Sequence, residues 1–178
     1  MTPEKVIDFW FAKHGEADWF AKKSAFDATI RKQFLPTYRA IVAGETHDWR
    51  VDPLGRLAEI IVLDQFARNI FRGTPESFAQ DPLALALAQE AVRLNADKVL
   101  SKRERRFFYM PYMHSESKKI QKLSVELFRA LGDKETLSYA LAHKKLIDRF
   151  GRFPHRNDIL GRRLTPEEKK LLKTHPGF

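Results

Sequence analysis

Five times in this chain a threonine or aspartate stands directly before a proline, and this pairing constrains the fold more than any other feature. Proline lacks an N–H group and suits the first position of a helix, where the preceding side-chain oxygen caps the exposed donors. The pairs are Thr2-Pro3, Asp52-Pro53, Thr74-Pro75, Asp81-Pro82 and Thr165-Pro166. Two capping boxes, Ser101-x-x-Glu104 and Thr165-x-x-Glu168, mark further helix starts, and Gly44, Gly73, Gly132 and Gly151 mark helix ends. The chain is therefore expected to be built from helices.

These signals predict helices at residues 3–13, 24–43, 53–72, 82–95, 102–110, 112–131, 134–150 and 166–173, with a short turn after Pro75. Pro36 should kink the second helix, and Pro111 should separate the fifth from the sixth, because proline removes a backbone donor and clashes with the preceding turn. Strand patterns are nearly absent and the connections are short, so successive helices should pack antiparallel. The predicted class is all-α, an array of antiparallel helical hairpins without a repeat of fixed period.

Length and composition place the chain among ordinary globular proteins. Its 178 residues, 43% of them hydrophobic, predict a single domain over residues 1–178 with one packed core. No apolar run is long enough to cross a bilayer and the N-terminus lacks the layout of a signal peptide, so we expect a cytoplasmic protein without a membrane partner. The absence of cysteine excludes disulfides, a thiolate nucleophile and cysteine-based metal sites.

Positive charge is concentrated in the last two fifths of the sequence. Residues 1–100 carry 13 Lys and Arg against 14 Asp and Glu, whereas residues 101–178 carry 19 against 9. Such asymmetry is typical of proteins with an anionic partner. It is equally typical of solvated helix surface, and the lysines are of that kind: Lys118, Lys119, Lys122, Lys144, Lys145, Lys169, Lys170 and Lys173. The arginines of residues 149–163 are a separate case.

The predicted helix over residues 53–72 is apolar on almost every face, which is typical of a buried central helix. Polar side chains enter its second half, and Asp64, Arg68 and Arg72 follow one stripe at a spacing of four. Buried charges of this kind must be paired, because an unpaired ion costs several kcal/mol. One interpretation is an Asp64–Arg68 pair that only orients the helix. The other is the wall of a pocket, to which Gln65 and Asn69 would also belong.

Two more segments set polar groups among apolar ones. An aromatic run broken by Pro111 is followed by His114 and Glu116, which we expect at a helix N-terminus, where backbone N–H groups favour anions. The helix that precedes Gly151 carries His143 and leads into residues 149–162, where arginines, a histidine and an asparagine alternate with phenylalanine, isoleucine and leucine. We therefore predict that the three segments converge, a hypothesis that fails if Arg68, His114 and Arg152 lie on separate surfaces.

The convergence hypothesis defines the candidate site. Its proposed catalytic residues are His114, Glu116 and His155. Its proposed ligand-binding residues are Asp64, Gln65, Arg68, Asn69, His143, Arg149, Arg152, Arg156 and Asn157. A histidine could move a proton near neutral pH, with Glu116 or Asp64 as its orienting carboxylate. Taken singly, each histidine is more often a structural hydrogen-bonding residue.

The same segments carry a family resemblance. The motifs are Asp8-Phe-Trp-Phe11, Asp64-Gln-Phe-Ala-Arg-Asn69, Met110-Pro-Tyr-Met-His-Ser-Glu116, Arg149-Phe-Gly-Arg-Phe-Pro-His-Arg-Asn157 and Leu160-Gly-Arg162. In this order they resemble the bacterial family known as domain of unknown function 924, over nearly the whole chain. The resemblance implies a fold of the tetratricopeptide-like superfamily and implies no assigned activity, cofactor or catalytic residue. One departure is Ala67, where the family often has proline, so the helix should be less kinked there.

Two functions from different classes fit these features. The first is a site that binds, and could turn over, a small anionic ligand, since arginine forks suit carboxylate and phosphate. The second is an interaction module that holds an acidic or C-terminal peptide in a tetratricopeptide-like groove. Nucleic acid is disfavoured, because the lysines are not interleaved with stacking aromatics. Neither a metal nor a cofactor is expected: His114-x-Glu116 lacks the i, i+4 histidine pair of a zinc helix and no nucleotide-binding loop is present. The sequence leaves the oligomeric state open.

Overall fold

The computed structural model describes residues 1–175 and 177, and the regular structure of these residues is helical throughout, without a β-strand. The α-helices are α1 (Pro3–Ile7), α2 (Glu16–Trp19), α3 (Ser24–Val42), α4 (Pro53–Ile60), α5 (Ala67–Ile70), α6 (Asp81–Arg93), α7 (Lys102–Met113), α8 (Lys118–Leu131), α9 (Lys134–Phe150) and α10 (Pro166–Leu172). The π-helical segment Asp8–Lys13 extends α1, and a second one, Ile61–Phe66, joins α4 to α5. Turns of 3-10 helix occupy His47–Val51, Pro75–Phe78 and Pro154–Arg156. The predicted all-α class is confirmed.

Several helix starts use the capping chemistry that the sequence indicated. Asp52 accepts a hydrogen bond from the Leu54 N–H at 2.7 Å, and complete capping boxes form at Ser101 and Thr165. The Thr2 and Thr74 side chains make no cap hydrogen bond although prolines follow them. Asp81 is also not a cap: it is the first residue of α6, and its carboxylate is used elsewhere.

The prediction that Pro111 ends a helix was wrong. Pro111 lies in the last turn of α7, which runs to Met113, and α8 begins only at Lys118. Pro111 lacks an N–H and so removes the donor for one carbonyl, that of Phe107 four residues earlier, and only two helical residues follow it. At the helix end the Gln121 side chain donates to the carbonyls of Met113 and Ser115, each at 2.7 Å.

Other predicted boundaries agree with the structure to within two residues, and α3 continues through Pro36. Neither α2 nor the 3-10 turn at His47–Val51 was predicted from the sequence. Both are single short turns, for which hydrophobic periodicity has too few residues to act on.

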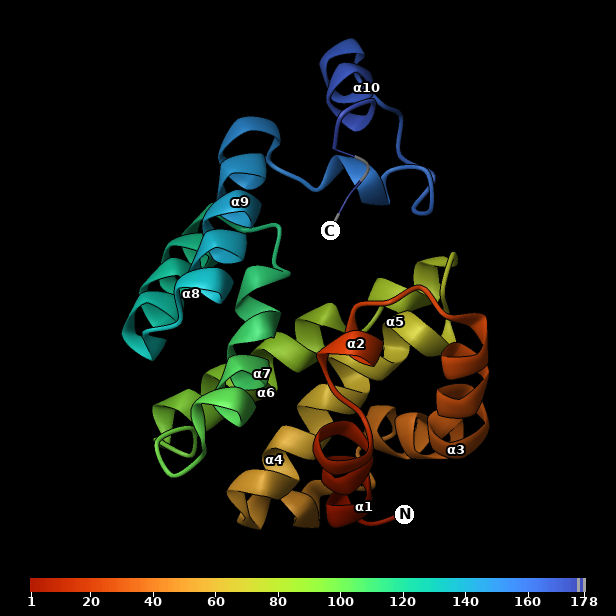
Figure 1. Ribbon diagram of the computed structural model, residues 1–178, viewed down its shortest axis with the longest axis vertical. Helices are drawn as coiled ribbons and strands as arrows, with labels where there is room; N and C mark the ends of the chain where they lie inside the picture. Colours follow the sequence, from red (N-terminus) through yellow and green to blue (C-terminus); the bar gives the residue numbers. More distant parts are fainter. Residues whose placement is uncertain (176, 178) are drawn as a thin grey trace.

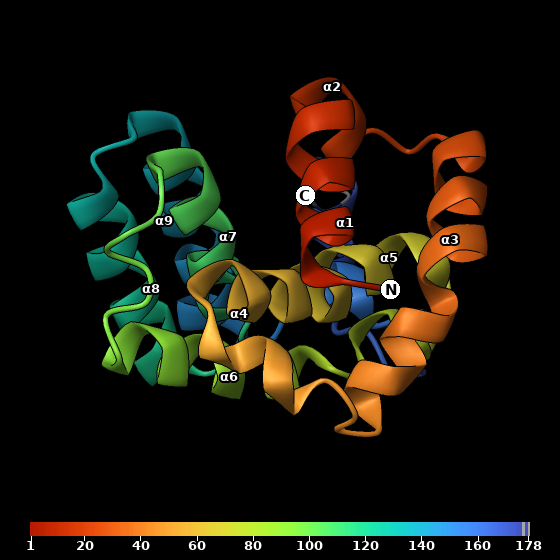
Figure 2. The ribbon, with the colours of Figure 1, turned by 90° about the horizontal axis from the view of Figure 1, so that it is seen from below.

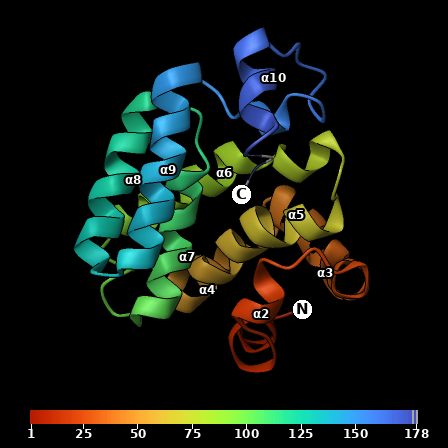
Figure 3. The ribbon, with the colours of Figure 1, turned by 45° about the horizontal axis from the view of Figure 1, so that its top comes forward.

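The central helical rod, α4 to α5, is the axis of the core. Ile60 through Phe66 are all buried, and they share the core with aromatic rings from the π-helical segment Asp8–Lys13 and from α2, α3 and α7. Trp10, for example, lies edge-on to Phe66 and to Phe107 at centroid distances of 5.3 and 5.7 Å. Figure 3 shows this rod crossing the molecule diagonally, with α7, α8 and α9 on one side and α2 and α3 on the other.

Consecutive helices of the second half lie beside one another. Helix α8 packs against both α7 and α9, and α7 also contacts α6 and α4. In Figure 1 the chain then leaves α9 for α10, which stands at the far end from α1, while Figure 2 shows α1 to α3 together on the opposite flank from α8 and α9. Among the described residues, no helix is both long and apolar enough to span a membrane.

Gly55 is required by a close backbone approach. A Cβ atom at this position would lie 2.0 Å from the carbonyl oxygen of Trp49, which is a backbone atom and cannot swing away. Alanine normally stabilises a helix by about 1 kcal/mol relative to glycine. We expect Gly55→Ala instead to lower the free energy of unfolding by about 1–3 kcal/mol, the cost of overpacking. Urea denaturation measures the change, and a variant as stable as wild type would refute the steric argument.

Candidate functional site

The polar stripe of the central rod begins in its π-helical segment. Asp64 and Gln65 belong to Ile61–Phe66, while Arg68 and Asn69 belong to α5. π-Helical turns are rare in proteins, and those that occur are often found at functional sites. Only 1% of the Asp64 side-chain surface is exposed, against 21% for Arg68, so the stripe runs from the core to the solvent.

Asp64 is held by three side chains. Nδ1 of His114 lies 2.7 Å from Oδ1 of Asp64, and Nη1 of Arg68 lies 3.2 Å from the same oxygen. The Gln65 amide donates to Oδ2, the other carboxylate oxygen. Burial by itself would raise the pKa of Asp64, but the charges of Arg68 and His114 and these hydrogen bonds outweigh it and hold the pKa well below its usual range. Asp64 is therefore ionised.

His114 occupies the C-terminal cap of α7, not the helix N-terminus that we had expected. An ionised carboxylate can only accept, so Nδ1 of His114 donates to Asp64 and its hydrogen sits on that nitrogen. Nε2 then faces away from Asp64, and 15% of the side-chain surface is exposed. The result is an oriented Asp–His dyad whose second ring nitrogen points away from the carboxylate.

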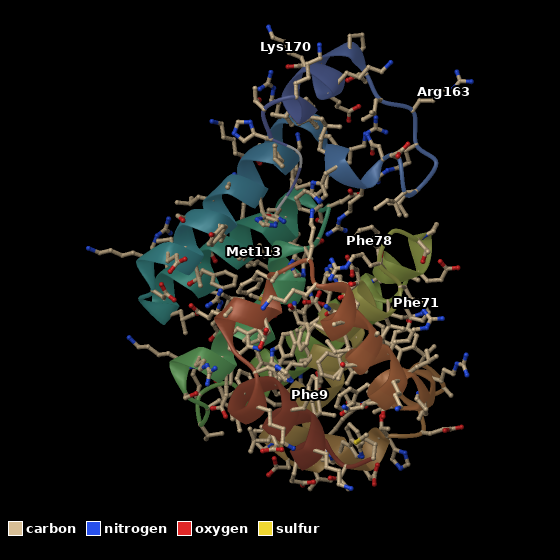
Figure 4. All side chains as sticks on the ribbon, turned by 45° about the vertical axis from the view of Figure 1, so that its right-hand side comes forward. Phe9, Phe71, Phe78, Met113, Arg163 and Lys170 are labelled. Carbon is tan, nitrogen blue, oxygen red and sulfur yellow. The ribbon has the colours of Figure 1, made fainter. Side chains whose placement is uncertain are left out.

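Asp81 joins the dyad to the C-terminal segment. Its carboxylate lies 3.1 Å from Nη2 of Arg68 and 3.0 Å from Nη1 of Arg156, and Nη2 of Arg156 donates to the His114 carbonyl at 3.2 Å. The Arg156 guanidinium also lies over the rings of Phe78 and Phe153, at 4.5 and 4.6 Å from their centroids. We call Asp64, Arg68, Asp81, His114 and Arg156 the charge cluster. Figure 4 places Phe78 and Met113, the neighbour of His114, near the middle of the molecule.

His143 and His155 lie beside the charge cluster. The His143 ring lies 6.1 Å from the His114 ring between centroids, and its Nδ1 contacts the Tyr139 carbonyl oxygen at 2.8 Å. Burial lowers the pKa of His143 to about 3, and burial with the nearby charge of Arg156 lowers the pKa of His155 to about 4. Both rings are neutral at neutral pH. A Cβ atom on Gly177 would lie 3.2 Å from His155, so the end of the described chain covers this ring.

Glu116 anchors the segment that supplies Arg156. It accepts two hydrogen bonds from Arg162, at 2.7 and 3.0 Å, and one from the Phe153 N–H at 2.8 Å. Burial would raise its pKa, yet these hydrogen bonds outweigh burial and lower it. Glu116 makes no hydrogen bond to His114 among the described contacts, so Asp64 is the carboxylate that orients the imidazole.

The remaining predicted site residues lie outside the charge cluster. Arg152 binds Glu168 at 2.7 and 2.8 Å, and this hydrogen bonding lowers the pKa of Glu168 to about 2. Arg149 pairs with Glu167 on the surface, and Asn69 donates to Asp27 at 2.8 Å. The convergence hypothesis therefore holds for Arg68 and His114 but not for Arg152, in whose place Arg156 reaches the cluster.

Asp81 and Phe78 were not predicted as site residues. Asp81 was interpreted as a helix cap before Pro82, and a capping aspartate cannot be told from a site aspartate without knowing its neighbours. Phe78 lies in a 3-10 turn, where nothing in the sequence indicates a cation above its ring. Arg162 was named within a motif, but not as the partner of Glu116.

Buried polar atoms without partners occur at Arg156 and at the residue that follows it. Asn157 is fully buried, yet neither its Nδ2 nor its Oδ1 has a hydrogen-bond partner, and the same holds for Nε of Arg156. Such groups are normally satisfied by water or a ligand, because an unmet buried donor costs about 1–3 kcal/mol. Among the described residues, no group of three histidine, aspartate or glutamate side chains could hold a metal ion.

Two surface hollows lie elsewhere. A shallow groove of about 620 Å³ follows the outer side of α8 and α9, and a hollow of about 330 Å³ lies between α1 and the start of α4. No member of the charge cluster lines either of them.

Fold and site together define an all-helical protein with a nearly buried network of two aspartates, two arginines and a histidine. Residues 6–176 match the family described as "Bacterial protein of unknown function (DUF924)", and the chain belongs to this family. None of the curated proteins matches it. It is similar to a solved structure, the protein of unknown function ATU0120 from Agrobacterium tumefaciens, at 39% identity with a TM-score of 0.93 over 97% of each chain.

Proposed function

We propose that the charge cluster binds a small anionic ligand at its partly exposed edge. Arg68 and His114 expose 21% and 15% of their side chains, so a ligand can reach them without unfolding the core. The observation that carries the proposal is the Asp64–His114 bond, which turns the protonated Nδ1 inward and leaves Nε2 for a ligand.

The charge balance of the cluster favours an anion. Two carboxylates offset two guanidinium groups, so the five side chains are neutral together when His114 is neutral. Protonation of His114 leaves one positive charge in a poorly hydrated place, and a bound anion would neutralise it. Anion binding is therefore expected to draw a proton onto the imidazole.

The same geometry suits proton transfer. An imidazole whose Nδ1 donates to a buried carboxylate has a fixed orientation, and the carboxylate stabilises the cation formed when Nε2 takes a proton. We propose His114 as the group that moves a proton if the ligand is turned over. Glu116 and His155 lie outside the Asp64–His114 dyad. Glu116 would hold the backbone at Phe153, and His155 would serve as a neutral hydrogen-bonding ring.

Calorimetric titration with acetate, succinate and inorganic phosphate tests this proposal. At least one anion should bind wild type, with proton uptake visible as a heat that depends on the buffer's ionisation enthalpy. His114→Gln can still donate to Asp64 but cannot take up a proton, so it should bind about ten-fold more weakly or not at all. Arg149→Gln, an exposed arginine outside the cluster, is the matched control and should bind like wild type. Equal binding by all three proteins would contradict the proposal.

We also propose that the helices form a single domain of the tetratricopeptide-like kind. Support comes from the order of contacts, in which α6, α7 and α8 each pack against the next helix along the chain. The connections between these helices are short: residues 114–117 join α7 to α8, and Gly132 and Asp133 join α8 to α9. Such short connections favour antiparallel hairpins. A groove on such an array is the setting for the second candidate function, the holding of an acidic peptide.

A further inference from the structure

The outer side of the α8–α9 pair carries a groove that the charge cluster does not use. Val125 and Arg129 of α8 line one wall, and Leu141, Lys144, Lys145 and Arg149 of α9 line the other. His143 and Lys145 are two positions apart on α9, about 200° around the helix. Since the His143 ring faces His114, the groove lies on the opposite face of α9 and is independent of the anion site proposed above.

The groove is strongly cationic. Four of its lining side chains are basic and one, Asp148, is acidic. Lys144 is paired with Asp148 and Arg149 with Glu167, whereas Arg129 and Lys145 take part in no ion pair of the described residues. A partner could therefore pair with Arg129 and Lys145 without breaking any ion pair of the described residues.

Apolar surface lies between these cations. Leu141 exposes 46% of its surface and lines the groove, while Val125, which also lines it, is buried. An exposed leucine bordered by cations is the complement of a helix that has one apolar face and acidic flanks.

We infer that the α8–α9 groove docks an acidic amphipathic helix of a partner protein. The groove follows α9 from residue 141 to residue 149, about 12 Å at 1.5 Å per residue, so two to three turns of a partner would fill it. Leucine-like side chains of the partner would cover Leu141, and its glutamates would pair with Arg129 and Lys145. Single-stranded nucleic acid fits less well, because no aromatic side chain lines the groove for base stacking.

The test uses a synthetic capped 15-residue helix with leucines at i, i+4 spacing and glutamates on both flanks, read by fluorescence anisotropy with the full-length protein. We expect saturable binding that weakens with salt. The double variant Arg129→Glu/Lys145→Glu should weaken binding at least about ten-fold. Lys169→Glu/Lys170→Glu is the matched control: it makes the same charge change at exposed positions of α10 and should stay within about two-fold of wild type.

Three further results decide between occupants. A peptide of identical composition with its leucines scattered around the helix should bind much more weakly, and equal binding would overturn the proposal in favour of non-specific attraction. Leu141→Ser should weaken binding of the amphipathic peptide, although it leaves the charge of the groove unchanged. The proposal is also overturned if the peptide fails to saturate, or if single-stranded DNA or anionic lipid vesicles bind more tightly with the same dependence on Arg129 and Lys145. Circular dichroism confirms that each variant is folded.

Discussion

Asp64→Ala is expected to lower the free energy of unfolding by about 3–5 kcal/mol, the cost of removing one partner from a buried ion pair. The change removes one of the two carboxylates that Arg68 contacts, leaving it paired with Asp81, and leaves Nδ1 of His114 without an acceptor. It also removes the acceptor of the Gln65 amide. Urea denaturation followed by tryptophan fluorescence measures the loss.

Asp148→Ala is the matched control. Asp148 pairs with Lys144 at the same i, i+4 spacing as Asp64 and Arg68, but 46% of its side chain is exposed. Exposed pairs of this kind contribute about 0.3–0.5 kcal/mol, so this variant should resemble wild type. In the double variant Asp64→Ala/Arg68→Ala the two losses should not add, because the two side chains contact each other directly within one network. Similar small losses in all variants would show that Asp64 does not hold a buried network.

Acidification from about pH 6.5 to pH 4 is expected to destabilise the protein through His143 and His155. Their pKa values in the folded protein, about 3 and about 4, are below the ordinary 6.5 of an unfolded histidine. Between these values only the unfolded chain binds the proton, so falling pH favours unfolding. Each histidine should contribute up to about 1.4 kcal/mol per pH unit, or roughly 3 kcal/mol by pH 4.

Carboxylates act in a different window, which allows the two effects to be separated. The folded pKa of Glu168, about 2, is below its ordinary 4.5, so its stabilisation is complete above pH 4.5 and is lost only as pH falls towards 2. Denaturation curves between pH 6.5 and 4.5 therefore report on histidine. His143→Gln should reduce the slope there. An unchanged slope in His143→Gln would contradict the burial argument.

Local chemistry explains why most helices could be placed from the sequence. A cap, a proline at the first position and a glycine at the end act within one helical turn and need no distant partner, as at Ser101 and Thr165. The prediction at Pro111 failed because the rule against proline is strict only in a helix interior. Only two helical residues follow Pro111, so the proline costs α7 one hydrogen bond, that to the Phe107 carbonyl, and does not end the helix.

The site was only half predictable, because local rules indicate that a buried charge needs a partner but do not indicate which distant residue provides it. A buried charge must be paired, so the occurrence of Asp64 and Arg68 within an apolar helix was enough to indicate a network. Which arginine of residues 149–162 would join them depended on the path of the chain after Gly151. Arg152 and Arg156 are four positions apart with similar surroundings in sequence, yet one turns to Glu168 and the other to Asp81.

The amino-acid sequence by itself determined the all-helical class, the places where most helices begin, and the need for a paired polar group in the central rod. These follow from backbone donors, proline and the cost of burying charge, all of which act locally. The tertiary structure alone decided that His114 meets Asp64, that Asp81 joins two arginines, and that α8 and α9 leave a cationic groove. Such contacts join residues up to 75 positions apart, and which partners meet depends on how the whole core packs.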